Sequence, residues 1–197
     1  ITFSDVDVSG GCVHPVGMYL RTYTATDECG NSSIFEQILD LVDTTAPELT
    51  IPADYTIECD QEVTLDGASA TDNCDSDVTI DYSEEITPGC GSSYVHTRTW
   101  TATDDCDNSS TATQTITVVD TTAPELSIPA DYTAECSDDH PMDDATATDN
   151  CEGDITIDVE AVTTPGLCTG DYTITRTFTA TDDCGNASSA TQTITIV

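Results

Sequence analysis

The stretch RTWTATDDC, residues 98–106, alternates threonines with Arg98, Trp100 and Ala102 before it ends in two acids and a cysteine. Successive side chains of a β-strand point to opposite faces, so one face of this stretch is all threonine and the other carries the aromatic residue. Threonine and tryptophan are both favoured in strands. We therefore predict a strand over 94–103, with its threonines exposed and Trp100 in the core. Arg98 is expected to lay its stem along the sandwich edge and to pair with an acid.

The same stretch recurs along the chain. RTYTATDEC (21–29) and RTFTATDDC (176–184) are copies of it, and DTTAPELTIPADYTIEC (43–59) returns as DTTAPELSIPADYTAEC (120–136). The period is about 77–78 residues, which is the size of a small domain rather than of a solenoid repeat. We predict three units: 1–42 as the C-terminal part of a first repeat, 43–119 as a second repeat and 120–197 as a third.

Each unit is predicted to be an all-β, Ig-like sandwich of about seven strands, because short alternating segments are separated by Gly, Pro, Asp and Asn clusters. Two of these strands, between 83 and 94, are poorly defined by the pattern. The expected strands of the second unit are 48–59, 68–71, 78–83, 94–103 and 112–119.

The charge balance is extreme. The chain has 38 acidic residues against 3 Lys and Arg, a formal net charge of −35. Nucleic-acid binding needs clustered cations, so it is excluded, and binding to anionic membranes is disfavoured. The sequence has no apolar run near the roughly 20 residues of a membrane span, so direct membrane insertion is not expected. Carboxylates at this density repel one another, which favours divalent cations as partners.

The ten cysteines indicate an oxidising compartment. Zinc and iron–sulfur sites use short spacings such as CxxC, whereas neighbouring cysteines here are about 15–30 residues apart. In the expected strand order, Cys74 and Cys106 lie at the linker end of a unit, with Cys59 and Cys90 at the far end. We therefore predict disulfides inside each unit, namely Cys59–Cys90, Cys74–Cys106, Cys136–Cys168 and Cys151–Cys184.

Acids from three segments also converge at the linker end of each complete unit. The expected Ca²⁺ ligands of the second unit are Asp43 or Glu48, Asp72 and Asp104. Those of the third are Asp120 or Glu125, Asp149 and Asp182. Ca²⁺ accepts six to eight oxygens in adaptable geometry, which suits a site assembled from loops. A solvated acidic loop is the alternative.

Several residues are candidate glycosylation sites. Asn31, Asn108 and Asn186 begin Asn-x-Ser triplets at equivalent places, although Asn and Ser are also common turn residues. Thr44 and Thr121, in the linker Asp-Thr-Thr, resemble O-glycosylation acceptors. No unit departs from the repeat to assemble a nucleophile, a base and an orienting group, so an enzyme is not expected.

At DTTAPELTIPADYTIEC (43–59), ATDNC (70–74) and RTWTATDDCDN (98–108) the sequence resembles the hyalin-repeat (HYR-like) domains of secreted and surface proteins. Bacterial versions, in long tandem arrays, look especially similar. The resemblance implies an Ig-like fold, an extracellular or bacterial-surface location and a structural or adhesive role. It offers no catalytic residues to transfer. Many such domains carry a cysteine in the last strand, where this chain has Ala112 and Ala190, so their pairing scheme is not carried over.

Two functions follow from these features. In the first, disulfide-stapled repeats rigidified by Ca²⁺ form the shaft of a surface fibre or adhesin stalk. Its partners would be neighbouring repeats of a long chain, lateral copies in a fibre and attached glycans. In the second, exposed loops recognise a carbohydrate or protein ligand. Near-identical units without an aromatic-rich loop favour the shaft.

Overall fold

A computed structural model describes residues 1–7, 17–137, 141–167 and 170–197. All regular structure within these ranges is β-strand, as predicted. By contacts, the chain divides into two compact units. One comprises Ile1–Asp54, Leu65–Glu85 and Thr97–Thr115, and the other comprises Tyr55–Thr64, Ile86–His96 and Ile116–Val197. No helix long and apolar enough to cross a membrane occurs in the described residues.

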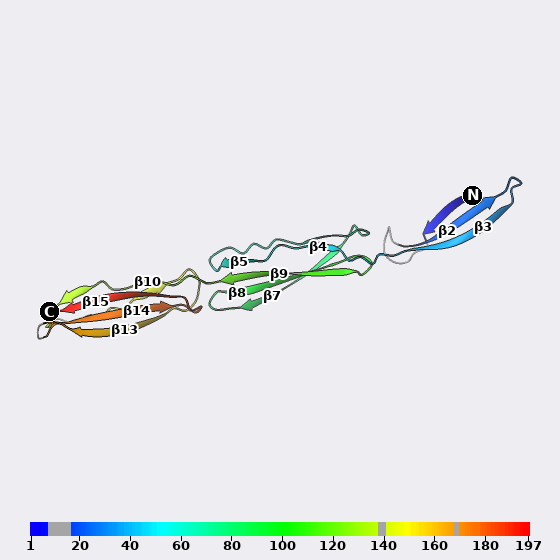
Figure 1. The fold of residues 1–197 in the computed structure, drawn as a ribbon. Helices are drawn as coiled ribbons and strands as arrows, with labels where there is room; N and C mark the ends of the chain where they lie inside the picture. The colour runs from blue at the N-terminus through cyan, green and yellow to red at the C-terminus, as the bar shows by residue number, and fades with distance from the viewer. Residues whose placement is uncertain (8–16, 138–140, 168–169) are drawn as a thin grey trace. The chain divides into compact units, whose positions relative to one another are not determined.

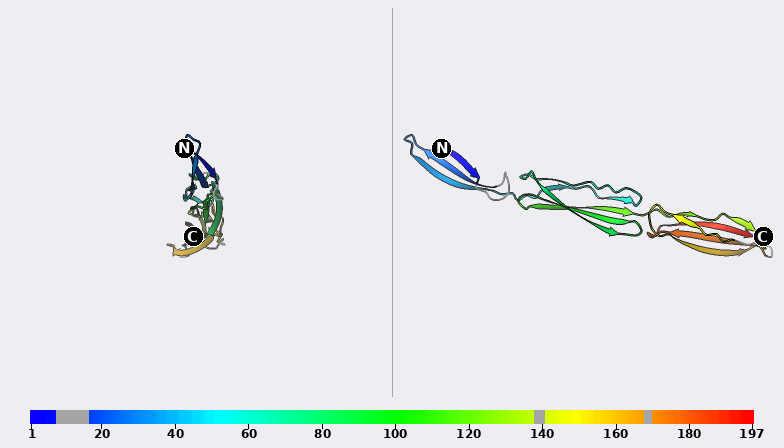
Figure 2. Two further views of the ribbon diagram at one scale, coloured as in Figure 1. Left: turned by 90° about the vertical axis from the view of Figure 1, so that its right-hand side faces the viewer. Right: turned by 180° about the vertical axis from the view of Figure 1, so that it is seen from behind.

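The third repeat lies wholly in the second unit and shows the fold most clearly (Figures 1 and 2). Its four-stranded sheet has the order β11-β15-β14-β13, and β10 and β12 form a separate antiparallel pair. Strand β10 contacts β14 and β15, so the pair covers one face of the larger sheet. The strands are β10 (Glu125–Ser127), β11 (Tyr132–Ala134), β12 (Thr146–Thr148), β13 (Thr156–Pro165), β14 (Tyr172–Thr181) and β15 (Ala187–Ile196).

The second repeat repeats this order. Its four-stranded sheet is β5-β9-β8-β7, with β4 and β6 paired antiparallel, and β5 runs parallel to β9. The strands are β4 (Glu48–Thr50), β5 (Tyr55–Glu58), β6 (Ser69–Thr71), β7 (Thr79–Pro88), β8 (Tyr94–Thr103) and β9 (Ser109–Val119).

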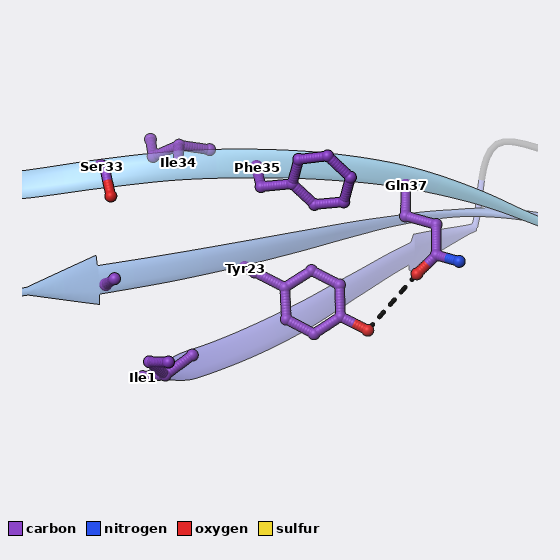
Figure 3. Close-up of a pocket in the computed structure, with 7 residues that line it drawn as sticks. Ile1, Tyr23, Ser33, Ile34, Phe35 and Gln37 are labelled. Atoms are coloured by element: carbon purple, nitrogen blue, oxygen red, sulfur yellow. Dashed lines mark hydrogen bonds between the residues drawn. The ribbon is translucent and has the colours of Figure 1, made fainter.

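The first 42 residues contribute one antiparallel sheet, β1-β2-β3, made of β1 (Thr2–Asp7), β2 (Gly17–Thr26) and β3 (Ser32–Leu41). Its apolar residues are exposed, with Phe3, Ile34 and Phe35 each more than 60% accessible. Ile1, Tyr23, Ile34 and Phe35 line an open pocket on this sheet (Figure 3).

Two expected features of the strand map were wrong. The strand expected over 48–59 is two strands, β4 and β5, which pair with different partners, β6 and β9. Pro52 lies between them, and proline lacks the N–H that a continuous ladder requires. The ill-defined strands between 83 and 94 are also absent from these described residues, because β7 extends to Pro88 and turns directly into β8.

The predicted alternation in β8 is confirmed. His96, Arg98, Trp100 and Ala102 are buried, whereas the intervening threonines are half-exposed. Strand β14 does the same with Phe178 and Ala180. Ile116 and Val118 of β9, and Ile194 and Ile196 of β15, are also buried.

The core also contains an arginine, which corrects the expectation that Arg98 covers an edge and pairs with an acid. Arg98 is only 5% exposed, and no carboxylate pairs with it in the described part of the chain. Its Nη1 donates hydrogen bonds to the carbonyl oxygen of Asp66 and to Oε1 of Gln114, each at 2.9 Å. Its guanidinium lies 4.6 Å from the ring centre of Trp100. Arg176 repeats the arrangement with Gln192 and Phe178.

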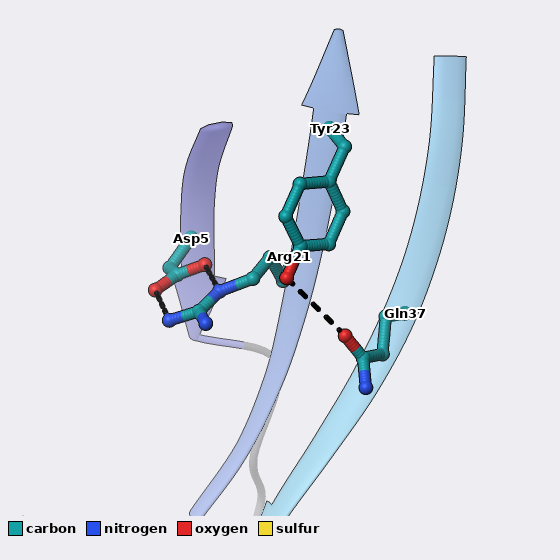
Figure 4. A network of polar contacts seen from close by, with 4 residues as sticks. All are labelled: Asp5, Arg21, Tyr23 and Gln37. Carbon is teal, nitrogen blue, oxygen red and sulfur yellow. Dashed lines mark hydrogen bonds and ion pairs between the residues drawn. The ribbon is translucent and has the colours of Figure 1, made fainter. Parts of the chain in front are cut away.

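In the first repeat the equivalent Arg21 is half-buried, with 30% of its side chain exposed, and it forms an ion pair with Asp5, its Nε lying 2.7 Å from Oδ1 (Figure 4). This contact lowers the pKa of the Asp5 carboxyl and raises the pKa of Arg21. Tyr23, equivalent to Trp100, donates a hydrogen bond to Gln37 at 3.4 Å.

Because Arg98 satisfies two buried oxygens, we expect Arg98→Met to lower the free energy of unfolding by about 2–3 kcal/mol. Arg21→Met is the matched control and should change it little, since exposed ion pairs contribute little. Urea unfolding of both variants measures the difference. Equal effects of the two substitutions would contradict a structural role for the buried guanidinium.

Candidate metal centre and disulfide junction

The acid that follows the repeated Thr-Ala-Thr closes a tight turn. Oδ1 of Asp104 accepts hydrogen bonds from the backbone N–H groups of Cys106 and Asn108 at 2.9 and 2.8 Å. Its Oδ2 accepts one from the carboxamide of Asn108 at 2.9 Å. Asp27 and Asp182 make the same contacts in the other two repeats. The orientation of this carboxylate is therefore set by residues of its own turn.

These hydrogen bonds also keep the carboxylate ionised. Burial opposes ionisation of Asp104, but the hydrogen bonds from Asn108 and from the Cys106 amide outweigh it and hold the pKa below the ordinary value. The pKa of Asp182 is lowered by the same balance. A buried group that stays anionic is suited to bind a cation.

The structure brings Asp104 together with two of its predicted companions. Ligand oxygens of Asp43, Asp72 and Asp104 all lie within 4.8 Å of one another. Oδ1 of Asp72 accepts hydrogen bonds from the backbone N–H groups of Cys74 and Asp75, which point its other oxygen inward. That Oδ2 is buried and has no hydrogen-bond partner among the described residues. A buried carboxylate oxygen without a partner is costly, and a bound cation would offset that cost.

The third repeat has a related arrangement, in which the group of ligand atoms contains Asp120 and Asp149 but not the predicted Asp182. Oxygens of Asp120 and Asp149 lie within 4.8 Å of each other and of the Cys151 sulfur, and Oδ2 of Asp149 is again buried without a partner in the described residues. The Cys151 sulfur belongs to a disulfide, so it is not a thiolate ligand. Burial, together with the charges of Asp182 and Asp149, raises the pKa of Asp120. A cation would relieve this repulsion.

The geometry fits Ca²⁺. Oxygens that bind one Ca²⁺ lie 2.3–2.6 Å from it, so two of them are at most about 5 Å apart. The oxygens of Asp43, Asp72 and Asp104 lie within 4.8 Å of one another, so one Ca²⁺ could contact all three. Glu48 and Glu125, the alternatives to Asp43 and Asp120, are exposed on β4 and β10 and lie outside both groups of oxygens.

The candidate glycosylation sites differ in accessibility. Asn108 and Asn186 are half-buried, and the nitrogen that would carry a glycan donates hydrogen bonds to Asp104 and Asp182. A glycan there would break the turn that orients the carboxylate. Asn31, Thr44 and Thr121 are exposed. Glycosylation remains a prediction at all five.

The disulfides differ from the predicted ones because they join different repeats. Cys59 of the second repeat is bonded to Cys151 of the third, and Cys90 is bonded to Cys184. The pairs Cys59–Cys90 and Cys151–Cys184 are therefore wrong. Cys74–Cys106 is wrong as well, since Cys106 is disulfide-bonded whereas Cys74 carries a free thiol. Cys136 also carries a free thiol, and its predicted partner Cys168 lies outside the described residues.

The reason lies in which ends meet. Cys59 follows β5 and Cys90 sits in the β7–β8 turn, so both are at the far end of the second repeat, as the strand order indicated. The far end of one repeat lies beside the linker end of the next, where Cys151 and Cys184 are found. The prediction considered only pairs within one repeat. It did not consider that a far-end cysteine can pair with a linker-end cysteine of the following repeat.

Further contacts consolidate this junction. Ser92 donates a hydrogen bond to the Glu152 carbonyl at 2.7 Å, and Glu58 accepts one from the Thr121 amide at 3.1 Å. Gly91 has φ +49°, and a Cβ on it would lie 3.3 Å from the Glu152 carbonyl oxygen. Glycine is therefore favoured here both for its backbone conformation and for the close approach.

All these features define a class of all-β repeat modules that are cross-linked by disulfides. Comparison with known proteins agrees: the model of the "HYR-like domain with 4 cysteines" matches residues 47–118 and again 124–196. The chain therefore belongs to this family. It is also 34% identical over 212 aligned residues to hyalin of Lytechinus variegatus, covering 95% of this chain and 38% of hyalin.

Solved structures show a weaker likeness. Drosophila N-cadherin EC1-4 has a TM-score of 0.35 at 18% identity, over 92% of this chain and 58% of that one. The protocadherin GammaB4 extracellular domain has a TM-score of 0.37 at 15% identity, over 99% of this chain and 43% of that one. At such TM-scores the likeness has no weight for ligand or function.

Family membership and the disulfides together make the chain an extracellular repeat module of the structural or adhesive kind. The relative is from Lytechinus variegatus, so the bacterial part of the expected location is not supported. The chain spans well under half of that relative.

One turn position offers a test of backbone strain. Asp107 has φ +64°, whereas the equivalent Gly30 and Gly185 have φ +84° and +85°. Because L-residues are disfavoured there, Asp107→Gly should raise the free energy of unfolding by about 0.5–1 kcal/mol. Asp107→Asn removes the same charge but keeps the side chain, so a gain as large as that of glycine would attribute the effect to charge instead. Thermal unfolding in EDTA compares the two.

The turn of the first repeat offers a pH test. Asn31 lowers the pKa of Asp27 through its side chain and its amide. A lowered pKa stabilises the turn at pH values above the ordinary pKa of Asp, and this is lost as the pH falls through the lowered one. We expect Asn31→Ala to move the pKa of Asp27, followed by NMR titration, back towards its ordinary value. An unchanged pKa would mean that the backbone amides alone hold the carboxylate.

Proposed function

We propose that this chain is part of a non-enzymatic extracellular shaft, in which Ca²⁺ binds at the start of each repeat and disulfides join successive repeats. The observation that carries the proposal is the duplicated carboxylate cluster, with one buried and unpartnered oxygen in each copy, on Asp72 and on Asp149. An acidic surface that merely solvates the chain has no reason to bury the same oxygen twice.

The proposed arrangement assigns the domains 1–42, 43–119 and 120–197, with Asp43 and Asp120 in the linkers that open the second and third repeats. Each linker aspartate would share its cation with two acids of the repeat that follows: Asp72 and Asp104, or Asp149 and Asp182. The cation thereby ties the linker to the sandwich. Asn108 reinforces this tie, because its carboxamide donates to both the Asp43 carbonyl at 3.2 Å and Asp104 at 2.9 Å.

The shaft is favoured over a ligand-binding module because the described turns at the candidate cation site are held by the same hydrogen bonds in each repeat. In the described part of the first repeat, most exposed large apolar side chains lie on strands β1 and β3 rather than on a loop. The partners are therefore proposed to be further repeats, joined in a fibre by lateral copies and attached glycans.

Ca²⁺ should raise the melting temperature of the disulfide-intact chain by on the order of 5–10 °C at millimolar concentration, because it binds the folded state alone. The rise should be largely lost in Asp72→Asn and in Asp104→Asn. Glu48→Gln is the matched control, since it removes one equally acidic but exposed side chain nearby. Calorimetry at fixed ionic strength, with Ca²⁺ and with EDTA, measures these shifts.

If Mg²⁺ or added NaCl raised the melting temperature equally, the effect would be explained by screening of the repulsion between carboxylates, without a specific Ca²⁺ site. A rise that survives in Asp72→Asn as fully as in Glu48→Gln would place the cation elsewhere.

A further inference from the structure

Three cysteines in the described part of the chain carry free thiols: Cys29, Cys74 and Cys136. Each has an equivalent in another repeat that is disulfide-bonded. Cys74 corresponds to Cys151, Cys136 corresponds to Cys59, and Cys29 corresponds to Cys184. The bonded equivalents all take part in the two bridges between the second and third repeats.

The free cysteines are held as their bonded equivalents are. The backbone N–H of Cys136 donates to the Val197 carbonyl at 3.0 Å, just as that of Cys59 donates to Val119 at 2.9 Å. The N–H of Cys74 donates to Oδ1 of Asp72 at 2.8 Å, and that of Cys151 to Asp149 at 2.9 Å.

Cys29 shows the same correspondence. Its N–H donates to Oδ1 of Asp27 at 2.9 Å, and that of Cys184 to Asp182 at 2.8 Å. The backbone of each free cysteine is therefore held in the same way as that of an equivalent cysteine that forms a bridge elsewhere in this molecule. Cys29 and Cys136 are also exposed, so a partner can reach them.

We infer that Cys74 and Cys136 are open ends of a disulfide ladder, each matched to a further copy of this repeat: Cys136 to the Cys151 position of a following copy, and Cys74 to the Cys59 position of a preceding one. The same rule assigns Cys29 to the Cys90 position of a preceding copy. The ladder would then place covalent bridges at successive junctions.

Each bridge forms by thiol–disulfide exchange with a disulfide-bearing oxidant. Two protein thiols give up two protons and two electrons to form the S–S bond, and the disulfide of the oxidant is reduced to two thiols. The inference extends the proposed shaft but does not depend on its cation, because only the cysteine pairing is at issue.

The test extends the full chain by one further copy of residues 120–197, joined after Val197. Free thiols are alkylated without reduction, and the disulfides are then mapped by mass spectrometry of peptides. In the unextended chain Cys136 should be alkylated almost completely. In the extended chain its alkylation should fall at least tenfold, and Cys136 should be found linked to the Cys151 position of the added copy.

Cys29 and Cys74 are internal controls, because the extension supplies no preceding copy and both should stay alkylated. Cys136→Ser in the extended chain should free one thiol, at the Cys151 position of the added copy. The inference is overturned if Cys136 stays alkylated in the extended chain, or if it bonds a cysteine of its own repeat.

Mapping is repeated in Ca²⁺ and in EDTA. If the new bridge forms but Ca²⁺ does not change the melting temperature, the proposed Ca²⁺ site is refuted and the inferred disulfide pairing stands. If Ca²⁺ stabilises the chain specifically but the new bridge does not form, the Ca²⁺ site stands and the inferred pairing is refuted.

Discussion

The small amount of apolar surface that each repeat can bury constrains everything else in this molecule. Threonine occupies every second position of β14, and of β8 from Thr97 onward, so only one side of each central strand faces inward. The inward side carries one aromatic residue, Trp100 or Phe178, followed by an alanine. A domain of this size with so thin a core has little hydrophobic stabilisation to set against chain entropy, and such domains generally rely on disulfides or metals.

The net charge of −35 makes that deficit worse, since carboxylates are concentrated where loops meet. A few specific contacts involve the charged side chains. Arg98 and Arg176 are used inside the core, where they bind amide and carbonyl oxygens, and are therefore not free to neutralise the surface. The aspartates at the start of each repeat are instead oriented by backbone N–H groups and converge on a common point. The most economical neutralisation of such a point is one divalent cation.

Much of this could be read from the sequence. The alternation in 98–103 identified the core side of the central strand, because the period of a strand leaves no ambiguity there. The convergence of Asp43, Asp72 and Asp104 followed from the order of strands alone, although the sequence could not choose between Asp43 and Glu48. That choice depends on whether residue 48 has already entered β4, where its side chain points to solvent.

The cysteine pairing could not be read in the same way. Strand order says at which end of a repeat a cysteine lies, but not what lies beyond that end. The buried arginine was missed for a related reason: its partners include the Asp66 carbonyl, in a loop that no strand pattern positions. Contacts within one element were therefore predictable, whereas contacts that depend on the path of a loop or on a neighbouring repeat were not.

The placement of the two bridges has a mechanical consequence. Cys59–Cys151 and Cys90–Cys184 are separated by 92 and 94 residues, and the linker at 120–124 lies inside both loops. Tension that reaches the second repeat therefore passes into the third through sulfur atoms, while the linker is bypassed. Unfolding under load cannot draw out the enclosed backbone, which would measure about 300 Å if extended. An oxidised array of such repeats would behave as a nearly inextensible cord, and reduction would convert it into a long, compliant spring.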